Sequence, residues 1–458
     1  MDWHCFGHAT WLAEIGGTRV LFDPLIDGLH HGDVFEVEPR RRVNVPAIEA
    51  DFLVVSHAHG DHFDLPSLYA LAKADPDTVV LTSDPIIARA TKRLGFARAE
   101  VVETWARVDL GGGGRLLTTP SYAEGETEWG ILITGDDTAV WNQVDSYHPD
   151  PATVQQTLAE ASRRVERDVT DGLPLAMVRW QPVLETAAVL ARGPGFPFDE
   201  YARSLARIAE VRAKTVIPSA AGVRQTAPYA WMNHYVYPVP HRRAERDIVA
   251  RAPGTRVLTA TIGATFHVIG SDVTVDARGA RHLVEPLEDF DPNNTVFRPY
   301  EMPALVDPNP SRRGESAMRA TVTSWVEGAL AHSLAASYRD FQVRRPLSLV
   351  LEVVYPASRD VFTITVSDSG ASVSRTFDDD HDVINTVAGS LLADVIEGHR
   401  SWGDPLLGGM IRAASRAYDL DETGLLISGL VPTFVYYGIP YEQSVERAIE
   451  YQLGQLLG

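Results

Sequence analysis

The chain has 458 residues, of which 45% are hydrophobic and 22% are charged, and its formal net charge is -20. This composition is typical of a soluble globular protein, and the length predicts two or more domains, because one core rarely serves more than about 300 residues. The acidic balance disfavours nucleic acid and anionic membranes as partners, because both carry negative charge.

The first part of the chain predicts short strands that alternate with helices. "HATWLAEIGG" and "TRVLFDP" predict two strands joined by a Gly-Gly turn, and "DFLVVSH" predicts a buried strand. Helical spacing follows in "PSLYALAKA" and "PIIARATKRLG", and strands are predicted at "TVVLTSD", "RLLTTP" and "WGILITGD". Residues 151–215 are largely helical, and "KTVIPS", "FHVIG" and "DVTVDAR" predict further strands. This mixture favours an α/β sandwich.

Residues 291–311 are rich in Pro, Asn and Asp and are predicted to link a domain of residues 1–290 to one of residues 312–458. The second domain begins with the helical pattern "SAMRATVTSWVEGALAHSLAAS", and three strands follow at "LSLVLEVVYP", "DVFTITVSD" and "ASVSRTF". We expect helices at "HDVINTVAGSLLADVIEGH" and "PLLGGMIRAASRAY", and an amphipathic C-terminal helix. This order predicts a small α+β domain.

Cysteine use and the N-terminus predict a cytoplasmic location. Cys5 is the single cysteine, so no internal disulfide can form, which suits a reducing compartment. The opening "MDWHCFGHATW" lacks the basic and apolar regions of a signal peptide, and no apolar run of about 18 residues is present.

The segment "SHAHGDH" concentrates potential metal ligands directly after a predicted strand. His57 and His59 alternate, so they project to the same side of an extended segment. A turn at Gly60 then lets Asp61 and His62 point towards a second, nearby position. The spacing H-x-H-x-D-H therefore predicts two adjacent metal ions rather than a group of solvated surface histidines.

These motifs resemble the metallo-β-lactamase superfamily over roughly residues 1–270. "GHATWLAEIGGTRVLFDP" is similar to the opening hairpin of that superfamily, with His8 and Asp23 at matching positions. "ILITGDD" is similar to the strand whose final aspartate bridges the two metals, which corresponds to Asp136. The resemblance implies an αββα sandwich, here followed by the smaller α+β domain, with a dinuclear metal site.

The chain departs from the superfamily's zinc hydrolases where they supply a third histidine to the first metal. No histidine is present between residues 63 and 147, and the matching loop offers Glu124, Glu126 and Glu128 instead. We favour Glu124, which lies four residues after Pro120 and close to the position of the family's histidine. The alternative is that all three glutamates are solvated loop residues.

The superfamily's last ligand is usually a histidine after a later strand, but here "KTVIPS" ends at Ser219. The next histidine is His234 in the aromatic-rich "YAWMNHYVYP", which we predict to be the ligand, and the alternative is a packed core histidine. The resemblance thus implies the metal ligands His57, His59, Asp61, His62, Glu124, Asp136 and His234.

A glutamate in place of an imidazole makes the site harder, which favours iron or manganese over zinc. Carboxylate-rich sites are typical of di-iron proteins. The same exchange occurs in the superfamily's branch of di-iron monooxygenases of antibiotic biosynthesis, such as the chloramphenicol-pathway β-hydroxylase and the platensimycin/platencin-pathway hydroxylase. The resemblance implies two iron ions and O2-dependent hydroxylation of an apolar small molecule, either terpenoid or amino-acid-derived, including CoA- or carrier-linked forms. The alternatives are a zinc or manganese hydrolase of an ester, lactone or phosphodiester, and a non-catalytic lipid-binding protein.

The source of electrons and the role of the second domain depend on weaker patterns. The chain has neither a cysteine cluster for iron–sulfur nor a G-x-G-x-x-G motif after a strand, so an external electron donor is expected. "IPSAAG" is similar to the matching loop of the CMP-sialic acid hydroxylase family, whose Rieske ligands are missing here. The C-terminal domain resembles a sterol-carrier-like fold, which implies an apolar ligand, and the alternative is a structural or dimerising module.

Overall fold

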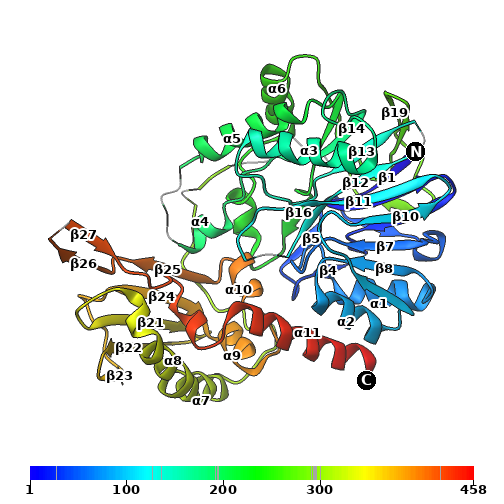
Figure 1. Cartoon of the computed structure of the whole chain (residues 1–458). Helices are drawn as coiled ribbons and strands as arrows, with labels where there is room; N and C mark the ends of the chain where they lie inside the picture. Colours follow the sequence, from blue (N-terminus) through cyan, green and yellow to red (C-terminus); the bar gives the residue numbers. More distant parts are fainter. Residues whose placement is uncertain are drawn as a thin grey trace.

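Two β-sheets lie face to face in the larger part of the protein, and a third sheet forms a smaller part beside them (Figure 1). The structure is a computed structural model, and it describes residues 1–26, 28–125, 127–135, 137–190, 192, 195–289, 291, 297–299, 301–422 and 424–458.

The first sheet has eight strands, in the order β19 (Asp272–Asp276), β18 (Thr265–Ile269), β1 (Asp2–Gly7), β2 (Thr10–Ile15), β3 (Thr18–Phe22), β7 (Phe52–Val55), β8 (Val79–Thr82) and β9 (Arg98–Val101). The predicted hairpin is confirmed as β2 and β3, which pair in antiparallel fashion. Strands β3, β7, β8 and β9 are parallel, so their carboxyl ends meet at one edge of the sheet. The histidine-rich motif follows β7 at that edge.

The second sheet has seven strands, in the order β10 (Arg107–Gly111), β11 (Gly114–Pro120), β12 (Trp129–Thr134), β13 (Ala139–Asn142), β14 (Leu175–Arg179), β15 (Thr215–Ser219) and β17 (Arg256–Val257). Strands β13, β14 and β15 are parallel. Between the sheets lies a core that includes Trp3, Trp11 and Phe22 of the first sheet and Ile131 and Met177 of the second, all fully buried. This contact holds the two sheets together as a sandwich.

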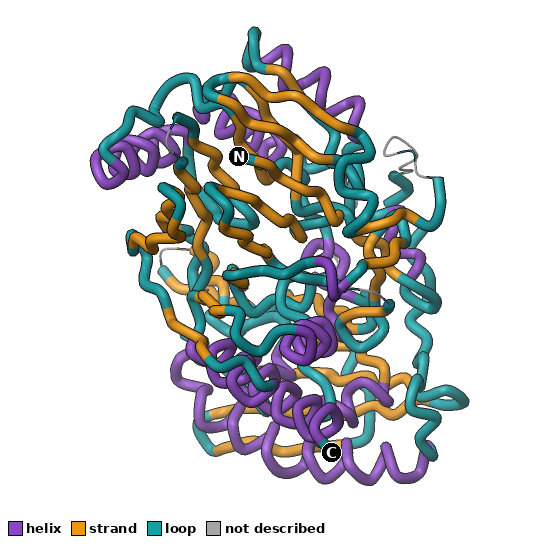
Figure 2. The backbone as a smooth tube through the Cα atoms, turned by 90° about the vertical axis from the view of Figure 1, so that its right-hand side faces the viewer, coloured by secondary structure: helices purple, strands orange, loops and turns teal. Residues whose placement is uncertain are grey.

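Helices cover the outer face of each sheet (Figures 1 and 2). The first is covered by α1 (Leu65–Ala74) and α2 (Pro85–Leu94), and the second by α3 (Pro151–Val165), α5 (Phe198–Val211) and α6 (His241–Arg251). Asp64 caps α1 by accepting a hydrogen bond from Ser67 N, and Asp150 caps α3 by accepting one from Thr153 N. The layers confirm the αββα order. None of the helices in the described part of the chain is both long and apolar enough to cross a membrane.

Short elements connect the longer strands and helices of the larger part. The small strands are β4 (Leu29–His30), β5 (Phe35–Val37), β6 (Arg41–Val43), β16 (Val223–Gln225) and β20 (Val284–Pro286), and the short helices are η1 (Val45–Ala47), α4 (Glu185–Val189) and η2 (Ala230–His234).

The smaller part contains a sheet in the order β23 (Gly370–Ser374), β22 (Arg359–Ser367), β21 (Leu347–Val354), β24 (Val383–Ala388) and β25 (Ile411–Ser415). Its helices are α7 (Glu315–Trp325), η3 (Val326–Leu330), α8 (Ala331–Ser337), η4 (Tyr338–Phe341), α9 (Gly389–Glu397), α10 (Gly403–Leu407), η5 (Phe434–Tyr437) and α11 (Tyr441–Leu457). The expected α+β domain is therefore confirmed as an architecture.

Two of its predicted helices are partly wrong. The first half of "HDVINTVAGSLLADVIEGH" is strand β24, and the second half of "PLLGGMIRAASRAY" contains strand β25. Strand β24 pairs with β21 in parallel and with β25 in antiparallel fashion. The residues of "VINTV" alternate between buried and half-buried positions, and most of them are β-branched. This two-residue period is typical of a strand, but the helix-favouring residues that follow it obscured it in the sequence.

The C-terminal helix α11 returns to the larger part of the protein and packs against α1 and α2 (Figure 1). Ile449 and Leu453 of α11 share one hydrophobic core with Leu68 of α1 and Ile87 of α2. The two parts therefore share buried apolar surface, and the boundaries at 1–290, 291–311 and 312–458 stay a prediction.

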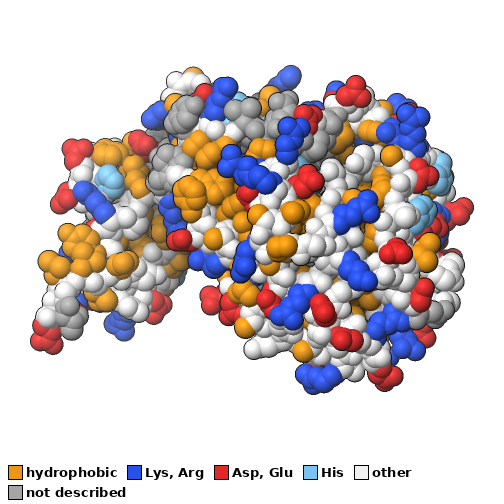
Figure 3. Space-filling view, turned by 90° about the horizontal axis from the view of Figure 1, so that it is seen from above, with side chains coloured by type: hydrophobic (Ala, Val, Ile, Leu, Met, Phe, Trp, Pro, Cys, Tyr) orange, Lys and Arg blue, Asp and Glu red, His pale blue; other side chains and the backbone are white. Residues whose placement is uncertain are grey.

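A hairpin of β26 (Tyr418–Asp421) and β27 (Gly424–Ile427) projects from the outer end of the smaller domain (Figure 1). Leu420, Leu425 and Ile427 are 67%, 58% and 74% exposed. Figure 3 shows apolar side chains gathered on this projecting lobe, whereas charged side chains of both signs are spread over the larger body. The outer end of the domain therefore presents an apolar surface.

Candidate metal centre

The structure brings the histidine motif and one distant aspartate together at the shared edge of the two sheets. Two groups form among the described residues, and within each group the potential ligand atoms lie within 4.8 Å of one another. One group is His57, His59 and Asp145, and the other is His8, Asp61 and His62. The motif turns directly after β7, where His62 N and Phe63 N both donate to His59 O.

Asp23, at the end of β3, orients two of these histidines. Its Oδ2 lies 3.0 Å from His62 Nδ1 and accepts a hydrogen bond from Ser56 Oγ at 2.9 Å. Because the Ser56 hydroxyl donates to Asp23, it accepts from His57 Nδ1 at 2.8 Å. These hydrogen bonds place a proton on Nδ1 of each ring, which leaves Nε2 as the atom that would bind a metal once it carries no proton. Histidines that bind metals typically donate a hydrogen bond from their other ring nitrogen to a carboxylate or another fixed oxygen in this way.

The ring nitrogens at the site have a spacing that fits bound cations. His57 Nε2 and His59 Nδ1 are 2.9 Å apart. This is close to the separation of roughly 3 Å between two nitrogens that bind the same metal ion at about 2.1 Å. His62 Nε2 is buried and has no hydrogen-bond partner among the described residues. It lies 3.6 Å from Asp61 Oδ2 and 3.5 Å from Asp145 Oδ2. Asp145 therefore stands between the two groups, and the donor set fits a dinuclear site.

His8 is better suited to orient Asp61 than to bind a metal. Gly222 N donates a hydrogen bond to His8 Nδ1 at 3.1 Å, so the neutral ring carries its proton on Nε2. That atom lies 3.2 Å from Asp61 Oδ2. A Cβ atom at Gly222 would come within 2.9 Å of His8 N, so the close approach requires glycine. His8 and Gly222 together fix the position of the Asp61 carboxylate.

The electrostatics keep both carboxylates ionised. Burial by itself would raise the pKa of Asp61 and Asp145, but the neighbouring groups together outweigh it, His62 first and then His8 for Asp61 and Arg179 for Asp145, so that both pKa values lie below their usual range. Burial lowers the pKa of His57, and the neighbouring rings lower it further. Burial would also lower the pKa of His62, but Asp61 and Asp145 outweigh it, so that its pKa lies well above the usual value. The ionised carboxylates of Asp61 and Asp145 thus lie close together, at a position that suits a cation.

Of the three predicted glutamate ligands, the two that the structure describes, Glu124 and Glu128, are not part of either group. Glu124 is exposed on the loop between β11 and β12, and Glu126 lies outside the described residues. Glu128 is buried and accepts a hydrogen bond from Ser121 Oγ. The metal role of a glutamate in this loop stays a prediction.

Asp136, the predicted bridging residue, also lies outside the described residues. The aspartate that the described structure brings to the histidines is Asp145, which follows the next strand, β13. Strands β12 and β13 are antiparallel, so the carboxyl end of β13, not that of β12, is at the same edge as the motif. Tracing the direction of this hairpin could have identified Asp145 from the sequence.

His234 is not brought into either group. It lies on η2, its side chain is 44% exposed, and its Nδ1 is 3.4 Å from Glu301 Oε2. His234 does line a cavity next to the site. It therefore lies near the candidate metal centre but belongs to neither group of ligands.

Two further residues that the sequence did not suggest lie near enough to the cluster to feel its charge. Burial and then the charge of Asp61 raise the pKa of Glu185, at the start of α4, to about 8. Burial and then the charge of Glu185 raise the pKa of Tyr237 well above its usual value. Glu185 therefore offers an additional carboxyl group to the site, and Tyr237 offers a neutral hydroxyl group.

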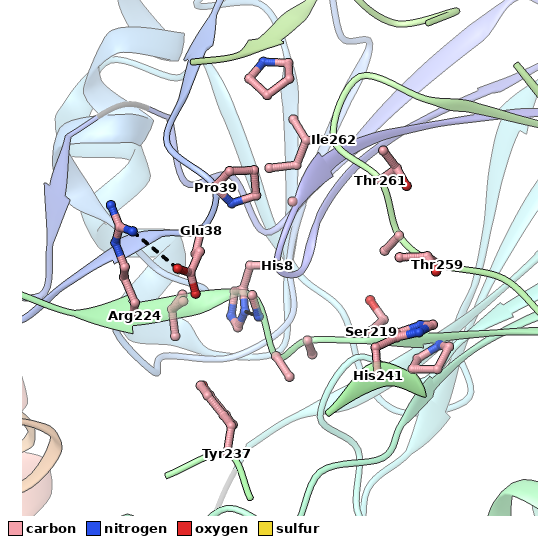
Figure 4. A pocket seen from close by; sticks show the side chains of 18 of the residues that line it. His8, Glu38, Pro39, Ser219, Arg224, Tyr237, His241, Thr259, Thr261 and Ile262 are labelled. Atoms are coloured by element: carbon pink, nitrogen blue, oxygen red, sulfur yellow. Dashed lines mark hydrogen bonds and ion pairs between the residues drawn. The ribbon is translucent and has the colours of Figure 1, made fainter. Parts of the chain in front are cut away.

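A cavity of about 850 Å³ opens beside the cluster and shares His8 and Tyr237 with it (Figure 4). Its wall carries apolar groups such as Ile262, hydroxyl groups, and an ion pair of Arg224 with Glu38 at 3.3 Å. All of the lining residues in the described part of the chain lie between positions 7 and 289. This volume is in the range of small-molecule sites.

Comparison with known proteins supports the fold and its association with metals. Residues 3–130 match the β-lactamase superfamily domain. A UPF0173 metal-dependent hydrolase of Carboxydothermus hydrogenoformans is 36% identical over 74 residues, which are 16% of this chain and 28% of that protein. The matches cover 28% and 27% of the lengths of the first two curated relatives. The chain therefore spans less than a third of either protein.

Two longer matches carry different names. The UPF0173 metal-dependent hydrolase EAT1b_0495 of Exiguobacterium sp. is 27% identical over 180 residues, or 36% of this chain and 69% of that protein. A protein of Mycolicibacterium smegmatis named as a Rieske 2Fe-2S iron-sulfur protein is 25% identical over 228 residues, or 47% of this chain and 42% of that protein.

Among solved structures, CmlA, a diiron β-hydroxylase from Streptomyces venezuelae, is 17% identical with a TM-score of 0.34, covering 48% of this chain and 45% of that chain. An isothiocyanate hydrolase from Delia radicum gut bacteria is 15% identical with a TM-score of 0.37, covering 57% and 95%. The matched segment, residues 3–130, contributes strands to both sheets of the sandwich and includes the histidine motif, so the similarity to the β-lactamase superfamily domain covers this part of the chain.

Proposed function

We propose that this protein is an O2-dependent di-iron monooxygenase that hydroxylates a small molecule. The observation that carries the proposal is the donor set, in which three imidazoles, those of His57, His59 and His62, share the site with the carboxylates of Asp61 and Asp145. Glu185 would raise the number of carboxylates to three, and a larger share of carboxylate ligands favours iron or manganese over zinc. Two bound iron ions would supply the activation of O2.

The protein's own residues hold and orient this centre. His57 and His59 would bind one metal, Asp61 and His62 the other, and Asp145 would serve both. Glu185 would add the further carboxylate that the sequence suggested at Glu124, Glu126 or Glu128. A group whose pKa lies near 8 without a metal becomes a ligand by losing its proton to solvent.

The cavity beside the cluster is the proposed substrate site. Its mixed wall suits a molecule with an apolar body and several polar groups, and Tyr237 and His8 lie where the cavity meets the metal centre. The relatives named as Rieske iron-sulfur proteins support an oxidative role, and an external protein would supply the electrons. We place the reaction in cytoplasmic secondary metabolism, including antibiotic biosynthesis, and expect neither nucleic acid nor membrane as a partner.

A metal-dependent hydrolase is the second candidate. It is favoured by the UPF0173 relatives, which are named as metal-dependent hydrolases, and two-metal sites can activate water for attack on an ester, lactone or phosphodiester.

Elemental analysis combined with an oxygen electrode tests the proposal. We expect the purified protein to hold two irons per chain and to consume O2 when it receives electrons. Asp145→Asn should lose metal, whereas Asp150→Asn, which keeps a capping side chain on α3, should not. Zinc binding with hydrolysis of model esters and no O2 consumption would instead establish the hydrolase.

A further inference from the structure

The smaller domain contacts the histidine motif through His31, which follows β4. A Cβ atom at Gly60, within the motif, would lie 1.7 Å from His31 Nδ1. A Cβ atom at Gly403, the first residue of α10, would lie 2.9 Å from His31 Nε2. The ring is therefore held between the motif and α10, and a side chain at Gly60 would displace it.

Charged groups of the smaller domain hold His31 in this position. Asp404 Oδ1 lies 3.0 Å from His31 Nε2, and Arg400 Nη1 lies 3.2 Å from Asp404 Oδ2. Arg400 Nη1 also donates a hydrogen bond to Gly32 O at 2.8 Å, next to His31 in the chain. The side chains of His31, Arg400 and Asp404 are only 13%, 13% and 7% exposed. Both the ring and the backbone of this segment are therefore fixed from α10.

The contact point lies between the two groups of candidate ligands. Gly60 directly follows His59, which belongs to the group with Asp145, and directly precedes Asp61, which belongs to the group with His62. A shift of Gly60 would change the separation of these two groups. Such second-layer contacts are what hold a metal site in its binding geometry.

The other end of the same segment supports the cavity. A Cβ atom at Gly409 would lie 2.3 Å from Trp231 Cζ2, and one at Gly408 would lie 2.6 Å from Tyr229 Cδ1. Trp231 belongs to η2, whose Asn233 and His234 line the cavity. Helix α10 lies at the junction of the two parts (Figure 1): Gly403 at its start adjoins His31, and the two glycines after its end adjoin Tyr229 and Trp231, which flank the cavity-lining part of η2.

We propose that Asp404 and Arg400 are positioning residues that fix the metal-binding loop through His31, so that the C-terminal domain is a working part of the metal centre. This inference rests on the proposed metal role of residues 57–62 and adds to it, because Asp404 and Arg400 belong to neither ligand group.

Titration of the full chain with Co²⁺, whose visible spectrum depends on its coordination, tests the proposal. We expect Asp404→Asn to weaken Co²⁺ affinity about tenfold and to change the spectrum. Asp382→Asn is the matched control, because the side chain of Asp382 is also 7% exposed and its Oδ2 lies 3.0 Å from Arg345 Nη1 in the same domain. The control should retain the wild-type affinity and spectrum, even where both variants lower the thermal midpoint equally.

Gly60→Ala should give the same change as Asp404→Asn by displacing His31 from the other side. If Asp404→Asn does not fold, His31→Phe replaces it, because phenylalanine keeps a ring against Gly60 and removes the contact with Asp404. Wild-type affinity and spectrum in the folded variants would overturn the proposal. Absence of Co²⁺ binding by the wild-type protein would instead overturn the metal site itself.

Discussion

His148 provides a quantitative prediction about the pH dependence of stability. Its side chain is 3% exposed, and its ring packs edge-on against Trp141, with ring centroids 5.6 Å apart. Its Nε2 atom has no hydrogen-bond partner in the described structure. Burial and then the guanidinium of Arg207 lower the pKa of His148 from 6.5 to about 4. The folded protein thus holds this ring neutral.

The sign and size of the effect follow from proton binding in the two states. Between about pH 6.5 and 4, the unfolded chain binds a proton at His148 that the folded chain does not bind, so stability falls as the pH decreases. A difference of roughly 2.5 pKa units corresponds to about 3 kcal/mol, at ~1.4 kcal/mol per unit. His148→Phe keeps a ring against Trp141 and removes the titrating group. We therefore expect the variant to lose about 3 kcal/mol less than the wild type between pH 7 and pH 4.

Carbon-13 NMR of labelled histidine rings and urea unfolding measure the two parts of this prediction. The resonance missing from His148→Phe should titrate near pH 4 in the wild type, and the stability of the variant relative to the wild type should rise by about 3 kcal/mol as the pH falls from 7 to 4. His332→Phe, at an exposed position, controls for the removal of a histidine from the surface. A His148 resonance that titrates near 6.5, or unfolding curves that keep a constant separation, would refute the reasoning.

Two further predictions concern the metal centre. Asp23→Asn should weaken metal affinity by about 10–100-fold in competition with a chelator, because Asp23 orients His62 directly and His57 through Ser56, and unchanged affinity would contradict this role. His234→Ala should retain both metals in elemental analysis, because its half-exposed ring faces Glu301, and loss of one metal would restore it as a ligand.

The sequence predicted those features whose residues are neighbours in the chain. The hairpin of β2 and β3, the buried strand β7 and the motif with His57, His59, Asp61 and His62 depend on local periodicity and spacing, and the structure has them as expected. Local pattern was misleading at β24 and β25, because pairing with β21 and with each other decided their conformation over a sequence that also suits helices.

Only the tertiary structure decided which distant residues complete the site. Asp145 reaches the motif because β13 runs antiparallel to β12 and ends at the same edge as β7. Glu185 faces the cluster from a short helix, and Asp404 reaches His31 from a domain that begins more than 250 residues later. The spacing of these residues in the chain carries no periodic signal, since their approach is set by strand order and by the packing of α10 between the two domains.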